Sequence, residues 1–131
     1  MPAFESPEFV LEDHLVEMFV QHFDGNTVHQ RGNKNEVLPE NTAPGMLVVS
    51  LAAKYSLKHP AFEKILCARG AEVKFKAPTF RGDRLFVRGT FEDSPHKERE
   101  GVNFRSCECE VVRKSDQKVV LVYTITQLMK A

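Results

Sequence analysis

Six consecutive residues in the first quarter of the chain carry groups that can move protons. The segment from Asp24 to His29 reads Asp-Gly-Asn-Thr-Val-His, so it holds a carboxylate, an amide and an imidazole. A carboxylate and an imidazole that converge on one water molecule can hold, deprotonate and reprotonate it. The pattern predicts an acid–base pair of Asp24 and His29. Asn26 can bond the loop backbone and hold the two in register.

A glycine and an apolar segment follow at a short distance. Residues 45–51 read Gly-Met-Leu-Val-Val-Ser-Leu, which is typical of a buried helix that begins at Gly45. The free backbone N–H groups and the dipole at a helix N-terminus can polarise a carbonyl oxygen. With the acid–base pair, this helix end is suited to adding water across a double bond conjugated to a carbonyl, or to removing it.

Three blocks of the sequence resemble one known family. D-x-N-x-x-H at 24–29, G-M-L-x-x-S-L at 45–51 and R-G-A-E-V-K-F-K-A-P-T-F-R-G-D-R-L at 69–85 are similar in order and spacing to MaoC-like (R)-specific enoyl-CoA hydratases of the hotdog superfamily. The resemblance runs from about Phe9 to the C-terminus. The family usually has proline and histidine where this chain has Thr27 and Pro44.

The resemblance implies a hydratase/dehydratase that interconverts 2-enoyl and (R)-3-hydroxyacyl thioesters. Asp24 and His29 would activate the water, and a backbone N–H of Gly45 or Met46 would polarise the thioester carbonyl. Pro44 and Ser50 match substrate-pocket positions. The acyl group would be carried on coenzyme A or acyl carrier protein, with no other cofactor. The family also implies a homodimer, or a dimer of dimers, with hotdogs joined edge to edge.

Several of these residues also have structural interpretations. Asp24 can cap a turn, and His29 can be a surface imidazole. Ser50 can bond back to its own helix, and Gly45 can be a packing glycine where helix and sheet approach closely. Cys67, Cys107 and Cys109 lack metal-ligand spacing and favour packed, reduced thiols, with the last two on one side of a strand.

Three other functions stay open on the sequence. One is a hotdog thioesterase, although residues 45–57 contain no acid. Another is conjugate addition of a different nucleophile, such as an amine, which Pro44 leaves open. The third is a non-catalytic acyl-binding subunit.

Composition bounds the remaining possibilities. The 131 residues predict one domain, large enough to bury roughly two-thirds of the unfolded chain's surface. Eighteen basic and eighteen acidic residues cancel without a basic run, which disfavours nucleic acid as a partner. With no signal-like N-terminus and no long apolar run, we expect a cytoplasmic protein without membrane segments. The histidines show no metal-site pairing, so no metal is expected.

The elements that position these residues follow from periodicity. We expect a helix over about 12–22, preceded either by a helix start at Ser6-Pro7-Glu8 or by extended chain at 9–11. An irregular loop over 30–42 leads to the helix at Pro44, which should be buried on most faces. Strands are expected at 71–76, 85–91, 102–112 and 119–128, with a turn at 81–83 and a connection over 93–101. Helices followed by an antiparallel meander describe an α+β domain. The resemblance makes it a hotdog fold, one central buried helix wrapped by a curved antiparallel sheet.

Overall fold

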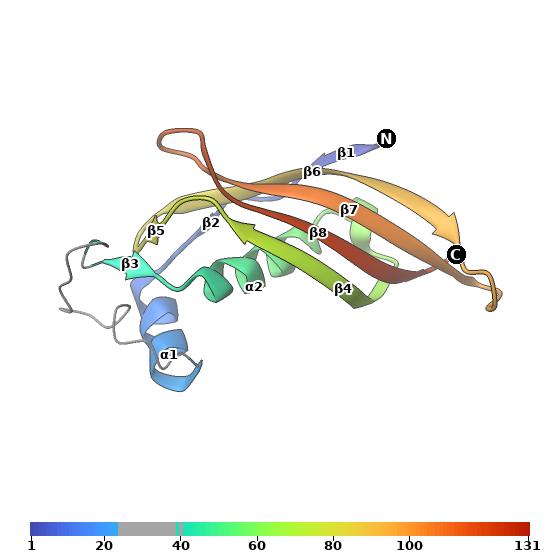
Figure 1. Ribbon diagram of the computed structural model, residues 1–131, viewed down its shortest axis with the longest axis horizontal. Helices are drawn as coiled ribbons and strands as arrows, with labels where there is room; N and C mark the ends of the chain where they lie inside the picture. Colours follow the sequence, from blue (N-terminus) through green and yellow to red (C-terminus); the bar gives the residue numbers. More distant parts are fainter. Residues whose placement is uncertain (24–38, 40) are drawn as a thin grey trace.

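The computed structural model describes residues 1–23, 39 and 41–131, and one antiparallel sheet dominates it (Figure 1). The strand order is β1-β6-β7-β8-β4, with β2 also paired to β6. The strands are β1 (Ala3–Glu5), β2 (Phe9–Val10), β4 (Ile65–Phe75), β6 (Arg84–Pro95), β7 (Val102–Arg113) and β8 (Lys118–Lys130). The sheet curves around α2 (Gly45–Ser56), which lies against its inner face (Figure 1). The expected α+β hotdog arrangement is confirmed.

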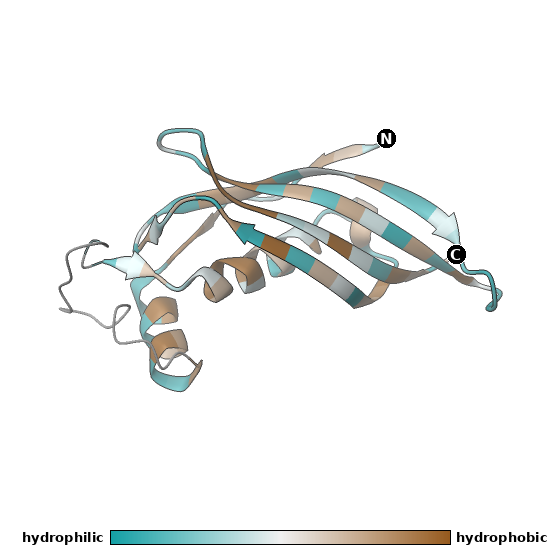
Figure 2. Cartoon of the chain, viewed as in Figure 1, coloured by the Kyte–Doolittle hydropathy of each residue, from teal (hydrophilic) through white to brown (hydrophobic). Residues whose placement is uncertain are grey.

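Alternation along the long strands separates the two faces of the sheet. On β7, Arg105, Cys107, Cys109 and Val111 are buried, while Ser106 and Glu108 between them are exposed. Successive side chains of a strand point to opposite faces, so the buried set faces α2. The alternation of apolar and polar residues is visible along the strands in Figure 2. The expected strands are present and longer than predicted, although β4 ends at Phe75, one residue before its predicted end.

Helix α2 buries one face rather than most of its surface. Leu47, Val48, Leu51, Ala52 and Ser56 are buried, whereas Met46, Ser50, Lys54 and Leu57 are exposed. The prediction of burial on most faces is therefore wrong for the single chain. The apolar residues on the exposed side lie next to β4, at the edge of the sheet.

The N-terminal segment is extended before α1 (Asp13–Phe23) begins. Ser6 does not cap a helix: its Oγ accepts from the Val87 N–H at 2.9 Å and fixes the N-terminal segment to β6. The helix start at Ser6 is thus wrong, and the extended alternative is confirmed by β2. Pairing with β6 wins because it buries Phe4 and Phe9.

Two short strands close the end of the sheet near the start of α2. β3 (Thr42–Ala43) pairs with β5 (Thr79–Phe80) as a separate two-stranded sheet. The turn at 81–83 is formed as predicted, with positive φ at Gly82. Asp83 accepts a hydrogen bond from the Phe80 N–H at 2.9 Å, so its carboxylate has a structural role in the turn. No described helix is long and apolar enough to cross a membrane.

Candidate functional site

A cavity of about 410 Å³ lies at the N-terminal end of α2. That volume is within the range of small-molecule sites, which are largely apolar with a few placed polar groups. The cavity is enclosed by β3, the start of α2, the end of β4 with the residues that follow it, β5 and β8. Its lining comprises Thr42, Ala43, Gly45, Met46, Val48, Phe75, Lys76, Ala77, Pro78, Thr79, Val120 and Leu121.

Gly45 and Met46, the first two residues of α2, line this cavity. Pro44 is the N-cap and supplies no side-chain cap. Its carbonyl accepts from the Leu47 N–H at 3.2 Å, but Gly45 and Met46 precede the first possible intrahelical donor. Among the described residues nothing accepts from the N–H groups of Gly45 and Met46. Two donors at the positive end of a helix dipole are suited to binding an oxygen that gains negative charge.

Gly45 also lies in close contact with the edge strand β4. A Cβ at this position would overlap the Phe75 ring, whose side chain is itself 55% exposed. The packing interpretation of Gly45 therefore holds, and it agrees with a role in carbonyl binding. Without a side chain, Gly45 leaves room for the Phe75 ring beside its backbone.

Buried polar contacts fix the wall of the cavity opposite α2. Arg113, at the end of β7, donates to the Pro78 carbonyl at 3.1 Å and to the Asp83 carboxylate at 3.2 Å. It also forms a two-point ion pair with Asp116. The hydrogen bond to Asp116 and then that to Asp83 raise the pKa of Arg113, which keeps the guanidinium charged. These contacts hold the 78–83 turn against the β7–β8 turn.

The sequence-predicted pocket residues lie at different distances from this cavity. Gly45 and Met46 line it, and Pro44 is buried just before them. Ser50 does not line it. Its hydroxyl donates to the Met46 carbonyl at 3.0 Å, which is the back-bonded alternative.

The predicted acid–base residues Asp24, Asn26 and His29 lie outside the described residues. The segment that contains them follows α1 after Phe23 and precedes Asn41 and Thr42. Thr42 lines the cavity, and the Asn41 carbonyl accepts from the Arg81 N–H at 2.9 Å beside it. Their catalytic roles stay predictions.

Phe75, Lys76 and Pro78 line the cavity but were not predicted as site residues. They belong to the Lys-Phe-Lys-Ala-Pro segment at 74–78, whose pattern indicates the end of a strand and not a site. Strand alternation places Phe75 on the same face as Val73 and Ala71. It does not reveal that β4 ends beside the start of α2, since that is a tertiary contact.

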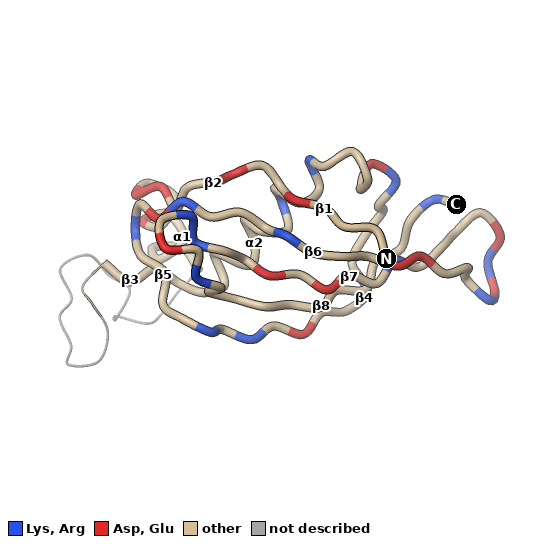
Figure 3. Tube along the Cα trace, turned by 90° about the horizontal axis from the view of Figure 1, so that it is seen from above, with Lys and Arg blue, Asp and Glu red and all other residues tan. Residues whose placement is uncertain are grey.

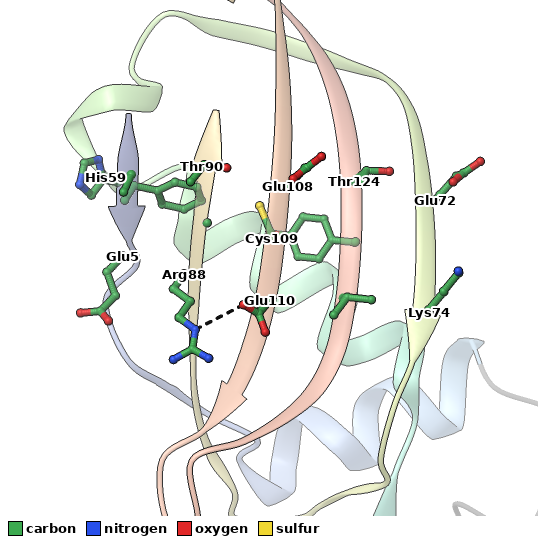
Figure 4. Close-up of a pocket in the computed structure, with 15 residues that line it drawn as sticks. Glu5, His59, Glu72, Lys74, Arg88, Thr90, Glu108, Cys109, Glu110 and Thr124 are labelled. Atoms are coloured by element: carbon green, nitrogen blue, oxygen red, sulfur yellow. Dashed lines mark ion pairs between the residues drawn. The ribbon is translucent and has the colours of Figure 1, made fainter. Parts of the chain in front are cut away.

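A larger concavity, of about 990 Å³, lies mainly on the other face of the sheet (Figure 4). It is lined by side chains of both charges, including Glu5, Glu72, Lys74, Glu108 and the ion pair of Arg88 with Glu110 at 3.6 Å. Acidic and basic residues are similarly interspersed over the described chain (Figure 3). This surface contains none of the predicted site residues, so the smaller cavity at Gly45 is the candidate site. Within the described ranges, no three His, Cys, Asp or Glu side chains form a metal-binding group.

Comparison with known proteins gives structural similarity only. No family model matches the chain, and no curated protein matches it. Among solved structures, a MaoC-like dehydratase from Rhodospirillum rubrum has 20% identity and a TM-score of 0.85, covering 98% of this chain and 90% of that one. A monoamine oxidase regulatory protein from Archaeoglobus has 18% identity and a TM-score of 0.82, with coverage of 98% and 88%.

An (R)-hydratase from A. caviae involved in PHA biosynthesis is also similar, at 14% identity and a TM-score of 0.72, covering 99% of this chain and 95% of that one. At such identities the similarity shows a shared fold, and it does not assign the roles of residues in those proteins to residues of this chain. The chain has the hotdog fold, and its structural neighbours include MaoC-like dehydratases and (R)-hydratases.

Proposed function

We propose that the protein is a hydratase/dehydratase that interconverts 2-enoyl and (R)-3-hydroxyacyl thioesters carried on coenzyme A or acyl carrier protein. The observation that carries the proposal is the start of α2. The N–H groups of Gly45 and Met46 have no acceptor in the described chain and border an apolar cavity in a hotdog fold. The named dehydratase and hydratase among the neighbours support it.

In the proposed reaction the thioester oxygen accepts from the Gly45 or Met46 N–H. Negative charge grows on that oxygen when water adds to the β carbon, so the two donors and the helix dipole stabilise the enolate more than the substrate. Asp24 and His29 hold the water, remove its proton as oxygen bonds to the β carbon, and deliver a proton to the α carbon. Dehydration runs through the same steps in reverse.

The architecture supports hydration over thioester hydrolysis. A hydrolase would need a water over the carbonyl carbon, activated by a group close to the helix. Helix α2 contains no Asp or Glu, and its first turn has no acidic residue. The non-catalytic alternative, to which the regulatory neighbour gives some weight, predicts binding without turnover.

The proposal includes a homodimer joined at β4. This strand ends the main sheet, with β8 as its partner in the described structure. Four large apolar side chains beside that edge are exposed by 47–57%, namely Met46, Leu57, Leu66 and Phe75. An unpaired, apolar sheet edge is normally covered, and a second copy would cover it.

An assay with crotonyl-CoA distinguishes a hydratase from a thioesterase and from a non-catalytic binding subunit. For a hydratase, absorbance of the conjugated enoyl group falls, a 3-hydroxyacyl thioester accumulates, and no thiol is released. Stoichiometric thiol release without the hydroxyacyl product would reassign the protein as a thioesterase. If longer enoyl thioesters and acyl carrier protein conjugates bind but none reacts, the binding subunit is the correct assignment.

A further inference from the structure

Arg81 contacts the chain on both sides of the segment that carries the predicted acid–base residues. Its Nη1 lies 3.0 Å from Oδ1 of Asp13 and 2.7 Å from Oε1 of Glu17, and both carboxylates belong to α1. Its backbone N–H donates to the Asn41 carbonyl at 2.9 Å, immediately before β3. Residues 24–40 join the end of α1 to Asn41 in the sequence. One residue therefore holds the chain before and after that segment.

The ion pairs between Arg81 and α1 involve a nearly buried cation. The Arg81 side chain is 8% exposed, whereas those of Asp13 and Glu17 are 55% and 44% exposed. The two acids are four residues apart, so they lie on one face of the helix, and both contact the same nitrogen. Charge-assisted contacts of this kind are short and strong. They fix which face of α1 turns toward Arg81.

The turn that carries Arg81 is itself fixed to the sheet. The Gly82 N–H donates to the Leu11 carbonyl at 2.8 Å, and the Leu11 N–H donates to the Asp83 carbonyl at 2.9 Å. Arg113 on β7 donates to the Asp83 carboxylate at 3.2 Å. β5, which precedes the turn, pairs with β3, and both strands line the cavity of the candidate site. The elements α1, β3 and β5 lie at one end of the sheet (Figure 1). Arg81 thus relates the position of α1 to the cavity wall.

The direction of α1 matters because Asp24 follows its last residue, Phe23. From Glu17 to Phe23 a helix rises about 9 Å, so a tilt of about 6° at Glu17 moves the helix end by about 1 Å. A misplacement of about 1 Å, caused by a change far from the chemistry, can lower a rate about a hundredfold. The buried face of α1 packs against the core through valines, and such apolar contacts are non-directional. The Arg81 pairs supply the direction.

We propose that Arg81 is a positioning residue for the acid–base pair: its guanidinium sets the direction of α1 and thereby the place of that pair relative to the start of α2. The inference rests on the proposed function, because it concerns how the same site is assembled. Arg81 acts here through α1 and not through contact with the substrate. Its loss should therefore slow the reaction without weakening substrate binding.

Arg81→Gln tests this role by separating kcat from KM. The substitution keeps a polar side chain and removes the charge that both carboxylates contact. For hydration of crotonyl-CoA, kcat should fall about tenfold, because the acid and the base are displaced, while KM changes by less than about twofold. Arg81→Lys should restore at least about half of the wild-type kcat, since both carboxylates contact a single nitrogen and no two-point fork is lost. An unchanged kcat in Arg81→Gln would overturn the inference.

A double variant shows whether Arg81 acts through the acid–base pair. In the Asp24→Asn background, Arg81→Gln should lower the residual kcat by less than about twofold, because one of the groups that it positions is already inactive. A purely structural role would not show this dependence on Asp24. A further loss of about tenfold in that background would indicate a general effect on the fold and would count against the inference.

Arg84→Gln is the matched control. Arg84 lies three residues further along the chain, and its Nη1 pairs with Glu8 at 3.1 Å, but its side chain is 66% exposed. The same loss of charge should leave kcat unchanged. A fall in kcat equal to that of Arg81→Gln would show that the charge of this region, and not the contact with α1, sets the rate, which contradicts the inference.

Glu17→Gln serves as a second variant if Arg81→Gln does not fold. It removes one of the two carboxylate charges from the same contact and keeps the pair with Asp13. It should lower kcat about two- to threefold in the wild-type background and have no effect in the Asp24→Asn background. An equal loss in both backgrounds would overturn the inference.

Hydrogen exchange tests the contact without turnover. In Arg81→Gln the backbone amides of α1 should exchange about three- to tenfold faster, while those of α2 should be unchanged. Unchanged exchange in α1 would show that Arg81 does not hold the helix and would overturn the inference. If the wild type hydrates no thioester, the hydratase proposal fails, and the positioning role fails with it. Hydration by the wild type with an equal kcat in Arg81→Gln removes the role of Arg81 alone and leaves the hydratase proposal intact.

Discussion

Arg105 on β7 and Asp93 on β6 face each other across the sheet and form a two-point ion pair. Nε and Nη2 of Arg105 donate to the two carboxylate oxygens at 2.7 and 2.9 Å. The guanidinium lies 3.9 Å from the centre of the Phe91 ring and also donates to the Ala61 carbonyl. The pair therefore joins the sheet to the segment that follows α2.

Removing one partner of this pair should lower the stability of the folded protein. The Arg105 side chain is 5% exposed, so Asp93→Ala would leave a buried charge with only part of its hydrogen bonding. We expect a loss of about 3 kcal/mol in the free energy of unfolding, measured by urea denaturation.

The matched control is a second ion pair between the same two strands, on the outer face of the sheet. Arg88 and Glu110 pair at 3.6 Å with both side chains nearly half exposed. Glu110→Ala should cost less than about 1 kcal/mol. Equal costs for the two variants would show that burial does not set the strength of the inner pair.

The three cysteines should differ in reactivity. Cys67 is exposed on β4, whereas Cys107 and Cys109 are buried, and burial raises the pKa of both. Because the thiolate is the reactive form, at about pH 8 a disulfide reagent should modify one thiol per native chain quickly. All three should react in denaturant. Rapid reaction of three thiols in the native protein would show that the inner face opens readily. Cys67→Ser removes the background that Cys67 gives in the thiol-release assay.

The sequence predicted much of the fold because its periodicities are local and strong. The 3.6-residue rhythm of α1 and the alternation in β4, β6, β7 and β8 each depend on one face being buried. The error at Ser6 has a tertiary cause: Ser-Pro-Glu is a good helix start locally, but Ser6 bonds Val87 on a strand about eighty residues away.

The candidate site was only partly predictable for the same reason. Gly45 and Met46 follow from a glycine before an apolar helix. Phe75 and Pro78 line the cavity because β4 ends beside that helix. No local pattern encodes these contacts. The exposed side of α2 was mispredicted because composition reports that a helix is apolar, not what covers it.

The proposed dimer should depend on the apolar residues beside β4. Leu57 and Leu66 are 47% and 53% exposed at this edge. Replacing both with Lys should give a monomer, because the interface would have to bury two unpaired charges. Sedimentation of the wild type at micromolar concentration should give twice the 14.9 kDa mass of one chain.

Met18→Lys is the control for assembly. Met18 is similarly exposed, at 48%, but lies on α1 and not on α2 or β4. Its replacement should leave the mass of the assembly unchanged. A monomeric wild type, or dissociation caused by Met18→Lys alone, would place the contact elsewhere or remove it.

The acid–base assignment gives the most direct prediction about catalysis. Asp24→Asn keeps the shape of the side chain without its charge, and His29→Ala removes the imidazole. Each should lower kcat for hydration by about two orders of magnitude or more while the thermal transition is preserved. Because both groups are proposed to act on one water, their effects should not multiply, and the double variant should be little slower than the slower single one. Hydration by either single variant at the wild-type rate would remove that residue from the mechanism. A double variant slowed by the product of the two single effects would instead indicate that Asp24 and His29 act in separate steps.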